Sequence, residues 1–186
     1  MAALIGGRVT SSVAVVIAAL NLTVGGLFMV RRAPLAVATL RDGALCAGSV
    51  AMGGVALKLA PPFDSWPLVA EASFVVAGVL AIGSLLALGD CFAVFPSLRG
   101  VVSRGPYAFV RHPVYLFETV MVLAASLAAW LGAASAGRAA LALLPLVVGV
   151  ALLALRIVIE ERLLAETEAY RAYRARVRWR LLPGIW

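Results

Sequence analysis

Five long apolar runs constrain the fold of this chain more than any other feature. They cover residues 10–30, 43–61, 66–89, 114–137 and 139–159. A helix needs about 20 predominantly apolar residues to cross the hydrocarbon core of a bilayer. The composition agrees, because 63% hydrophobic residues, 13% charged residues and a mean hydropathy of +1.03 lie far outside the range of soluble domains. The sequence therefore predicts an all-α integral membrane protein with about five transmembrane helices in a single membrane domain.

Basic residues are distributed unevenly between the connectors of these runs. If all five runs cross the membrane, every Lys and Arg except Arg8, Lys58 and Arg138 falls on one side. The positive-inside rule makes that side cytoplasmic. We therefore expect the lipid bilayer as a partner, the N-terminus outside and the C-terminus in the cytoplasm.

The charge pattern and the cysteines also argue against two classes of ligand. The basic residues follow the membrane topology and most of the chain length serves the bilayer, so we expect no nucleic-acid partner. Cys46 and Cys91 share no short spacing with each other or with the single histidine, His112. We therefore expect both thiols to be structural and no metal to bind.

The connector at 90–113 carries an unusual group of polar residues. The stretch 104–115 reads RGPYAFVRHPVY and contains the only histidine of the chain. Pro113 suits the first turn of a helix, which places His112 at the start of the fourth run. Tyr107 and Tyr115 flank it. One interpretation is a structural histidine between interfacial tyrosines, and the other is a cationic, aromatic loop that encloses a polar ligand at the membrane boundary.

A second group of polar residues lies at the end of the fifth run. Arg156 and Glu160 are four residues apart, so they project from the same face of one helix. They form either a snorkelling ion pair or a functional pair, because ionisable groups at membrane depth are costly. The following segment, 160–186, is charged, with apolar residues at spacings of three and four. It predicts an amphipathic helix on the cytoplasmic interface from Glu160 to Arg180.

Three segments taken together resemble a known family. They are VVSRGPYAFVRHPVYLFE at 101–118, the pair Glu160-Glu161, and YRAYRARVRWRLLPGIW at 170–186. This combination resembles the isoprenylcysteine carboxyl methyltransferase family and its relatives among bacterial membrane methyltransferases and phospholipid methyltransferases. The resemblance covers residues 89–186.

The resemblance implies a methyltransferase that uses S-adenosylmethionine and releases S-adenosylhomocysteine. It implies activity at the cytosolic face of a bacterial inner membrane, on a small or lipid-like amphiphilic acceptor, most simply a carboxylate. Phe92 stands where prenylcysteine enzymes carry a polar cofactor contact. A prenylated protein is therefore not assumed as the acceptor, and amine and phospholipid methylation stay open.

Residue roles follow from the same resemblance. Arg156 occupies the position that faces the methyl acceptor and is the expected catalytic residue. The expected cofactor-binding residues are Arg99, Gly100, Val101, Val102, Tyr107, His112, Pro113, Val114, Tyr115 and Glu160.

Two other functions are compatible with the sequence. The first is a membrane reductase of the steroid-reductase type, which would bind NADPH at the cytosolic face instead of S-adenosylhomocysteine. The second is a membrane scaffold without turnover, which would be indifferent to Arg156→Ala and Glu160→Ala.

Overall fold

A computed structural model describes residues 11–184 and 186 of the chain. The five long helices are α1 (Ser12–Val30), α2 (Leu40–Leu59), α3 (Leu68–Leu88), α4 (Pro113–Leu131) and α5 (Ala136–Leu164). Each of the five is long and apolar enough to cross a membrane. The prediction of an all-α integral membrane protein is confirmed. Thr10, where the first span was expected to begin, and Arg8 lie outside the described residues.

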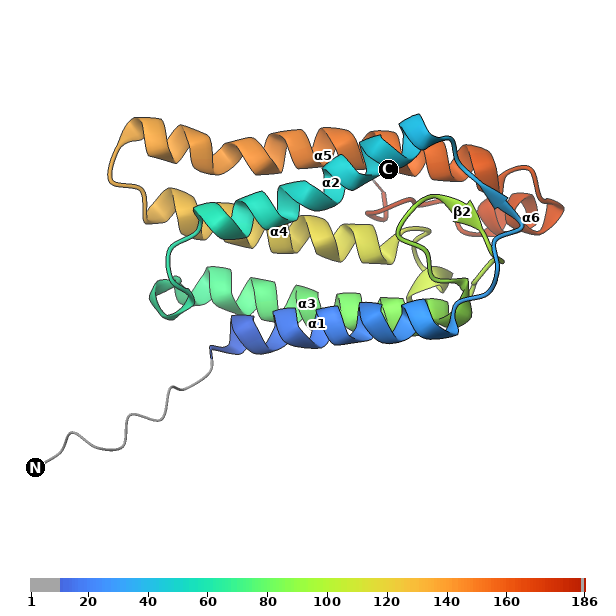
Figure 1. Cartoon of the computed structure of the whole chain (residues 1–186), viewed down its shortest axis with the longest axis horizontal. Coiled ribbons are helices and arrows are strands. Elements are labelled where there is room, and N and C mark those ends of the chain that lie inside the picture. Colours follow the sequence, from blue (N-terminus) through green and yellow to red (C-terminus); the bar gives the residue numbers. More distant parts are fainter. Residues whose placement is uncertain (1–10, 185) are drawn as a thin grey trace, which may run out of the picture.

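The helices form an elongated bundle in which α4 takes the central place (Figure 1). α4 packs on α3, α5 and α2, whereas α1 packs on α3 and α2 packs on α5. Small residues allow these close approaches: a Cβ atom added to Gly78 of α3 would lie 2.2 Å from Cγ1 of Val16 on α1. α1 and α2 are consecutive in the chain, yet each takes its main partner from elsewhere in the bundle.

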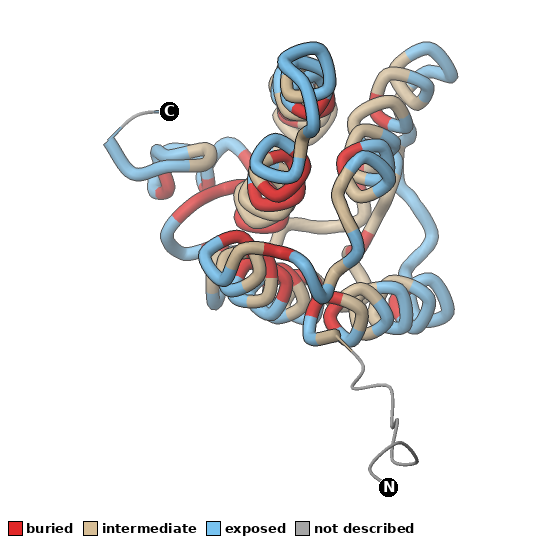
Figure 2. Tube along the Cα trace, turned by 90° about the vertical axis from the view of Figure 1, so that its left-hand side faces the viewer, coloured by how far each residue is buried: buried red, intermediate tan, exposed pale blue. Residues whose placement is uncertain are grey.

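The outer surface of the bundle is apolar. Buried stretches of the helices turn toward one another and exposed stretches turn outward (Figure 2). The outward positions include Leu22, Leu80 and Val147, which are 77%, 46% and 66% exposed. Such a surface is compatible with lipid tails and not with water.

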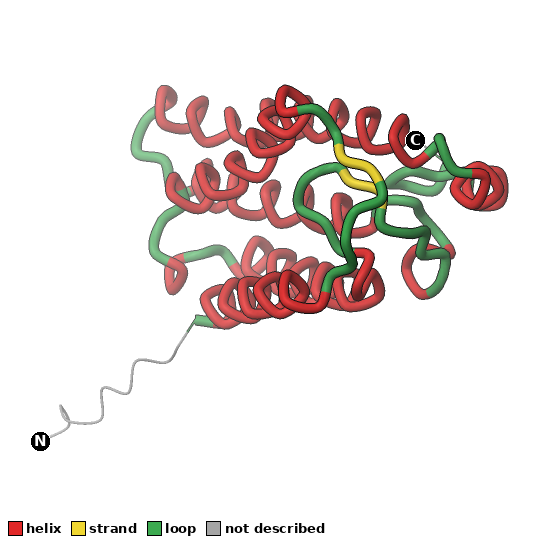
Figure 3. The backbone as a smooth tube through the Cα atoms, turned by 45° about the vertical axis from the view of Figure 1, so that its right-hand side comes forward, coloured by secondary structure: helices red, strands yellow, loops and turns green. Residues whose placement is uncertain are grey.

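The polar connectors gather at one end of the bundle (Figure 3). Strands β1 (Ala36–Val37) and β2 (Ser97–Leu98) pair antiparallel there and join the α1–α2 connector to the α3–α4 connector. An ion pair between Arg32 and Asp90, with Nε 2.6 Å from Oδ2, reinforces this junction. The short helices η2 (Gly89–Cys91) and η3 (Gly105–Ala108) and the helix α6 (Glu168–Arg176) complete this end. Among residues 11–184, the connectors at the opposite end are the one that contains the short helix η1 (Phe63–Ser65) and the α4–α5 turn.

Several helix boundaries differ from the expected ones, and local capping explains the differences. α4 ends at Leu131, before Gly132, and α5 begins at Ala136 because the Ser135 side chain accepts a hydrogen bond from the Arg138 amide. Ser and Thr favour this cap position. The connector between these helices is therefore longer than expected.

The prediction of one amphipathic helix from Glu160 to Arg180 is wrong, because the structure divides this segment between two helices. α5 continues through Glu160 to Leu164, and α6 starts only at Glu168, after Thr167 caps it by accepting from the Tyr170 amide. The charged side chain of Glu161 does not end α5 because it is buried among polar partners instead of facing the interface. Beyond Arg176 the chain leaves the helix and folds back under the α3–α4 connector.

Candidate functional site

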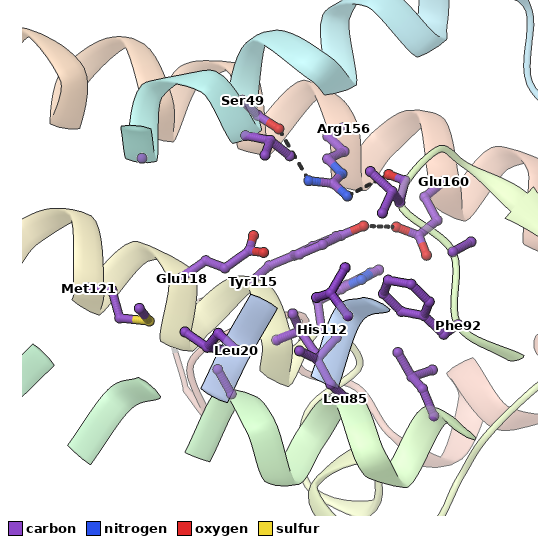
Figure 4. Close-up of a pocket in the computed structure, with 18 of the residues that line it drawn as sticks. Leu20, Ser49, Leu85, Phe92, His112, Tyr115, Glu118, Met121, Arg156 and Glu160 are labelled. Carbon is purple, nitrogen blue, oxygen red and sulfur yellow. Dashed lines mark hydrogen bonds between the residues drawn. The ribbon is translucent and has the colours of Figure 1, made fainter. Parts of the chain in front are cut away.

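A cavity of about 430 Å³ opens between the helices and the connectors. Helices α1 to α4 contribute apolar walls, while the α3–α4 connector, the end of α5 and the tyrosines of α6 contribute polar groups. Its size lies within the range of ligand-binding cavities. Figure 4 shows that Arg156, Tyr115, Glu160, His112 and Glu118 reach this space from α4, α5 and the residue preceding α4.

Arg156 is held in place by three contacts on the wall of the cavity. Its Nη1 donates to Ser49 Oγ at 3.3 Å, and its Nη2 donates to the Val94 carbonyl at 2.7 Å. Its guanidinium lies over the Tyr115 ring, 4.6 Å from the centroid. The side chain is only 4% exposed, and its Nε is buried without a partner among the described residues. Arg156 is therefore a fixed positive charge in the cavity.

Tyr115 connects this arginine to Glu160. The Tyr115 hydroxyl donates to a carboxylate oxygen of Glu160. His112 contacts the ring of the same tyrosine. The His112 ring stacks on Tyr115 with centroids 5.4 Å apart and an interplanar angle of 3°. The stack orients the phenol, so the position of Glu160 depends on two aromatic residues that precede or begin α4.

Glu161 has a different environment from its neighbour. It accepts hydrogen bonds from Arg111 Nε at 2.7 Å, Arg180 Nε at 2.9 Å and the Tyr170 hydroxyl at 3.3 Å, and His112 Nε2 lies 3.2 Å away. The carboxylate is 4% exposed. This glutamate is the buried counterion that joins the connector, α5, α6 and the C-terminal tail, and it orients His112 by a direct contact.

The C-terminal tail supports the connector through its backbone. The amides of Arg111 and His112 donate to the carbonyls of Trp179 and Arg180, both at 2.9 Å. The Arg111 side chain also donates to two tail carbonyls. The tail therefore fixes the approach of the chain to His112.

Two tyrosines close the end of the cavity nearest the connectors. The Tyr173 hydroxyl donates to the Tyr107 carbonyl at 2.7 Å, and both rings are buried. Burial raises the pKa of Tyr173 to about 12 and raises the pKa of Tyr107 well above its ordinary value. Both phenols are therefore neutral hydrogen-bond donors at physiological pH.

The segment Gly100–Val102 lines the cavity. Gly100 has φ +152°, and a Cβ added there would lie 2.8 Å from Cys91 Sγ, so glycine is required. The amides of Gly100, Val101 and Val102 donate to no backbone carbonyl among the described residues. The protein backbone therefore does not use these amide donors.

The deep half of the cavity is apolar. Its walls come from residues such as Leu20 of α1, Phe74 of α3, and Met121 and Ala125 of α4. Glu118, also on α4, lies at the border between this half and the polar half (Figure 4). The cavity is therefore amphipathic, with its polar groups toward the end of the bundle where the connectors gather.

Most residues expected at the site from the sequence lie together around the cavity. Nine of them line it: Gly100, Val101, Val102, Tyr107, His112, Val114, Tyr115, Arg156 and Glu160. Arg99 and Pro113 do not: Arg99 turns to Ser97, donating from Nε to Oγ at 3.2 Å, and Pro113 is fully buried at the first turn of α4.

The sequence reasoning missed several residues of the site. Glu118 was given no role, Ser49 carried no motif, and Glu161 was noted only as part of a pair. Glu118 could have been found from its spacing, since it follows Tyr115 by three residues on the same helix face. Among the described residues, no three His, Cys, Asp or Glu side chains are grouped so that they could hold a metal ion.

A five-helix bundle with an amphipathic cavity near the end where its connectors gather defines an integral membrane protein with a candidate ligand site. The chain belongs to the phospholipid methyltransferase family, whose model matches residues 67–171 and so covers α3, the α3–α4 connector, α4, α5 and the start of α6. It is thus a membrane methyltransferase by family. No curated protein matches the chain.

Proposed function

We propose that the protein transfers a methyl group from S-adenosylmethionine to a lipid-like amphiphile at the cytosolic face of a bacterial inner membrane. The observation that carries the proposal is the amphipathic cavity, in which the polar groups of the α3–α4 connector and α5 meet an apolar space between α1, α2, α3 and α4. One cavity can therefore receive a polar methyl donor from the cytosol and an apolar acceptor from the bilayer.

The polar half fits the groups of S-adenosylmethionine. The free amides of Gly100, Val101 and Val102 suit the carboxylate of its methionine part, and Glu160 suits its ammonium or ribose hydroxyl groups. Tyr107 and His112 provide aromatic surface for an adenine ring. The cofactor would supply an activated methyl group on a sulfonium, and the residues named here would bind and orient it.

The apolar half fits the hydrocarbon part of an acceptor. Leu20, Phe74, Met121 and Ala125 offer it no hydrogen bonds, which suits an acyl or alkyl chain and disfavours a sugar or a nucleotide. An acceptor with its chain there would place its head group at the level of Arg156 and Tyr115. That level is where the polar and apolar halves meet.

Arg156 is the proposed catalytic residue, as a fixed charge beside the transfer position. Its contacts with Ser49, Val94 and the Tyr115 ring hold it without help from a ligand. Methyl transfer is a displacement that gains mainly from positioning and from exclusion of water, and a rigid, buried site provides both. Because both terminal nitrogens of Arg156 already have protein partners, a carboxylate acceptor is not the only head group that this site favours.

The reductase and scaffold alternatives would each require a different set of polar groups in the cavity. A reductase of the steroid-reductase type would need partners for the phosphates of NADPH. Of the two arginines that line the cavity, Arg111 is already paired with Glu161, and Arg156 lies beside two carboxylates, Glu118 and Glu160. That balance favours a cationic donor over a polyanionic one. A scaffold would not need so enclosed a polar site.

Transfer of labelled methyl groups tests the proposal. The purified protein in nanodiscs of bacterial lipid extract receives S-adenosylmethionine with a labelled methyl group, and label is measured in the organic extract. We expect Arg156→Ala to reduce transfer by roughly 100-fold while S-adenosylhomocysteine still binds.

The matched control is Arg162→Ala, which removes an exposed arginine from the same helix and should leave transfer unchanged. Equal transfer by the wild type and Arg156→Ala would contradict the catalytic role of this residue. No transfer by a wild-type protein that binds S-adenosylhomocysteine, across all lipid extracts, would favour the scaffold.

A further inference from the structure

The outward face of α6 and the chain that follows it form a strongly basic surface. Four exposed arginines make up this surface, and none of them takes part in an ion pair within residues 11–184: Arg171, Arg174, Arg176 and Arg178. Glu168 is the only acidic residue between positions 168 and 186. Four like charges within eight residues repel one another, so an anionic partner would stabilise this surface.

The chain after α6 carries exposed indoles at the level where the membrane begins. Trp179 and Trp186 are 39% and 36% exposed. The amides of Arg111 and His112 donate to the carbonyls of Trp179 and the residue after it, which holds this part of the chain beside the first turn of the membrane-spanning helix α4. Indoles prefer this boundary between hydrocarbon and water. The basic surface therefore lies next to the head groups of the bilayer.

Anionic phospholipid is the partner that fits this surface best. α6 lies at the end of the bundle where the connectors gather (Figure 1), the end predicted to be cytoplasmic. The cytoplasmic leaflet carries a negative surface potential, which attracts basic segments near the membrane. A guanidinium group also matches the geometry of a phosphate, because it can donate two parallel hydrogen bonds to it.

The inward face of α6 closes one end of the cavity, so a lipid on the outward face can act on the site. Tyr170 and Tyr173 line the cavity from α6. The Tyr170 hydroxyl donates to Glu161 at 3.3 Å, and the Tyr173 hydroxyl donates to the Tyr107 carbonyl at 2.7 Å. A helix of nine residues is too short to be stable alone, so the contacts on its two faces determine where α6 lies.

We propose that the arginine face of α6 binds anionic phospholipid head groups of the surrounding membrane, and that this contact holds α6 against the cavity. Bound lipid favours the closed arrangement of the cofactor site, so anionic lipid and cofactor strengthen each other's binding. The lipid contact is independent of the proposed function, and only its effect on cofactor binding rests on that function.

Quenching of tryptophan fluorescence by brominated lipids tests the lipid contact. Trp66→Phe and Trp130→Phe remove the indoles at the opposite end of the bundle and leave Trp179 and Trp186 as reporters. The protein is placed in phosphatidylcholine nanodiscs with a minor fraction of brominated phosphatidylglycerol or, for comparison, of brominated phosphatidylcholine. We expect phosphatidylglycerol to be preferred roughly tenfold near the reporters, and added salt to weaken this preference.

Three substitutions on the basic surface separate the charge from the fold. Arg171→Gln, Arg174→Gln and Arg178→Gln together should abolish the preference, whereas Arg171→Lys, Arg174→Lys and Arg178→Lys together should retain most of it. The matched control is Arg138→Gln, an exposed arginine at the opposite end of the bundle, which should leave the preference unchanged. Equal quenching of the wild-type surface by both brominated lipids, or a preference that survives the three glutamines, would overturn the lipid contact.

Titration with S-adenosylhomocysteine in nanodiscs with and without phosphatidylglycerol tests the effect on the site. We expect the wild type to bind roughly fivefold more tightly with phosphatidylglycerol present, and the variant with three glutamines to bind equally in both bilayers. Equal affinities for the wild type would overturn the coupling. A wild type that prefers phosphatidylglycerol but binds S-adenosylhomocysteine in neither bilayer would contradict the proposed function instead, so the two failures are distinguishable.

Discussion

Two adjacent glutamates on α5 have different partners and therefore different expected roles. Glu160 faces the cavity and meets the Tyr115 hydroxyl, whereas Glu161 is buried against Arg111, His112 and Arg180. Successive residues of a helix point about 100° apart, so one turn of α5 serves both the ligand space and the tail.

Glu161→Gln should destabilise the protein far more than Glu160→Gln. The substitution leaves Arg111 and Arg180 without their anion, and breaking a buried ion pair costs about 3–5 kcal/mol. Thermal unfolding of the two variants in the same detergent measures the difference. Similar melting temperatures for Glu161→Gln and the wild type would contradict the structural role of this network, and Glu160→Gln serves as the charge-matched control.

At the level of single residues, the sequence pointed to cavity-lining residues when they belonged to one short segment of the chain. RGPYAFVRHPVY and the pair four residues apart on α5 supply seven of the residues that line the cavity: Tyr107, Arg111, His112, Val114, Tyr115, Arg156 and Glu160. Ser49 and Glu161 were not assigned a role because their partners, Arg156 and Arg111, lie far away in the sequence. Arg99 was expected at the site from the resemblance alone; its side chain donates to Ser97, and its role stays a prediction.

Among the helices, the contact between α1 and α3 depends on one small residue. Gly78 is buried on α3, and a methyl group there would meet Val16 of α1 at 2.2 Å. Valine has few rotamers with which to move away, so the helices themselves would have to separate. The next residue of α1, Ile17, lines the cavity, so the contact lies beside one cavity wall.

Gly78→Ala should therefore lower stability even though alanine favours helices. We expect a loss of about 1–3 kcal/mol from overpacking, measured by thermal or denaturant unfolding in detergent. Gly83→Ala is the matched control on the same helix, since nothing lies within 4 Å of its added Cβ. It should be neutral or slightly stabilising, and an equal loss in both variants would show that the close approach is not the cause.

The helices themselves were predictable because each apolar run is long, whereas their ends were not. α5 passes the two glutamates because they turn into the protein, and only the folded partners reveal this. The break before α6 depends on the Thr167 cap. This local signal was overlooked because the charge pattern of the segment continues across it.

For the whole molecule, the distribution of basic residues predicts that the cavity opens toward the cytoplasm. Ala108 lies exposed in the α3–α4 connector, and Ala134 lies exposed in the α4–α5 turn at the opposite end. Cysteines at these two places should therefore report opposite sides of the membrane. The arrangement remains a prediction from charge, since the helices alone would fit either orientation.

Labelling of Ala108→Cys and Ala134→Cys in intact cells and in inverted vesicles checks this prediction. An impermeant maleimide should react with the first only from the cytoplasmic side and with the second only from outside. The wild type, with Cys46 buried and Cys91 partly buried, provides the background. Labelling of Ala108→Cys from outside would show that the topology is the reverse of the predicted one and that the cavity opens away from the cytoplasm.

The account as a whole depends on a cofactor site at the polar end of the cavity. The most direct measurement is calorimetric titration of the purified protein with S-adenosylhomocysteine, beside NADPH, for the wild type, Glu160→Gln and the exposed control Glu166→Gln. We expect saturable binding of S-adenosylhomocysteine alone, weakened roughly tenfold by Glu160→Gln and unchanged by Glu166→Gln. Binding of NADPH instead, or no binding by a well-folded protein, would contradict the methyltransferase site.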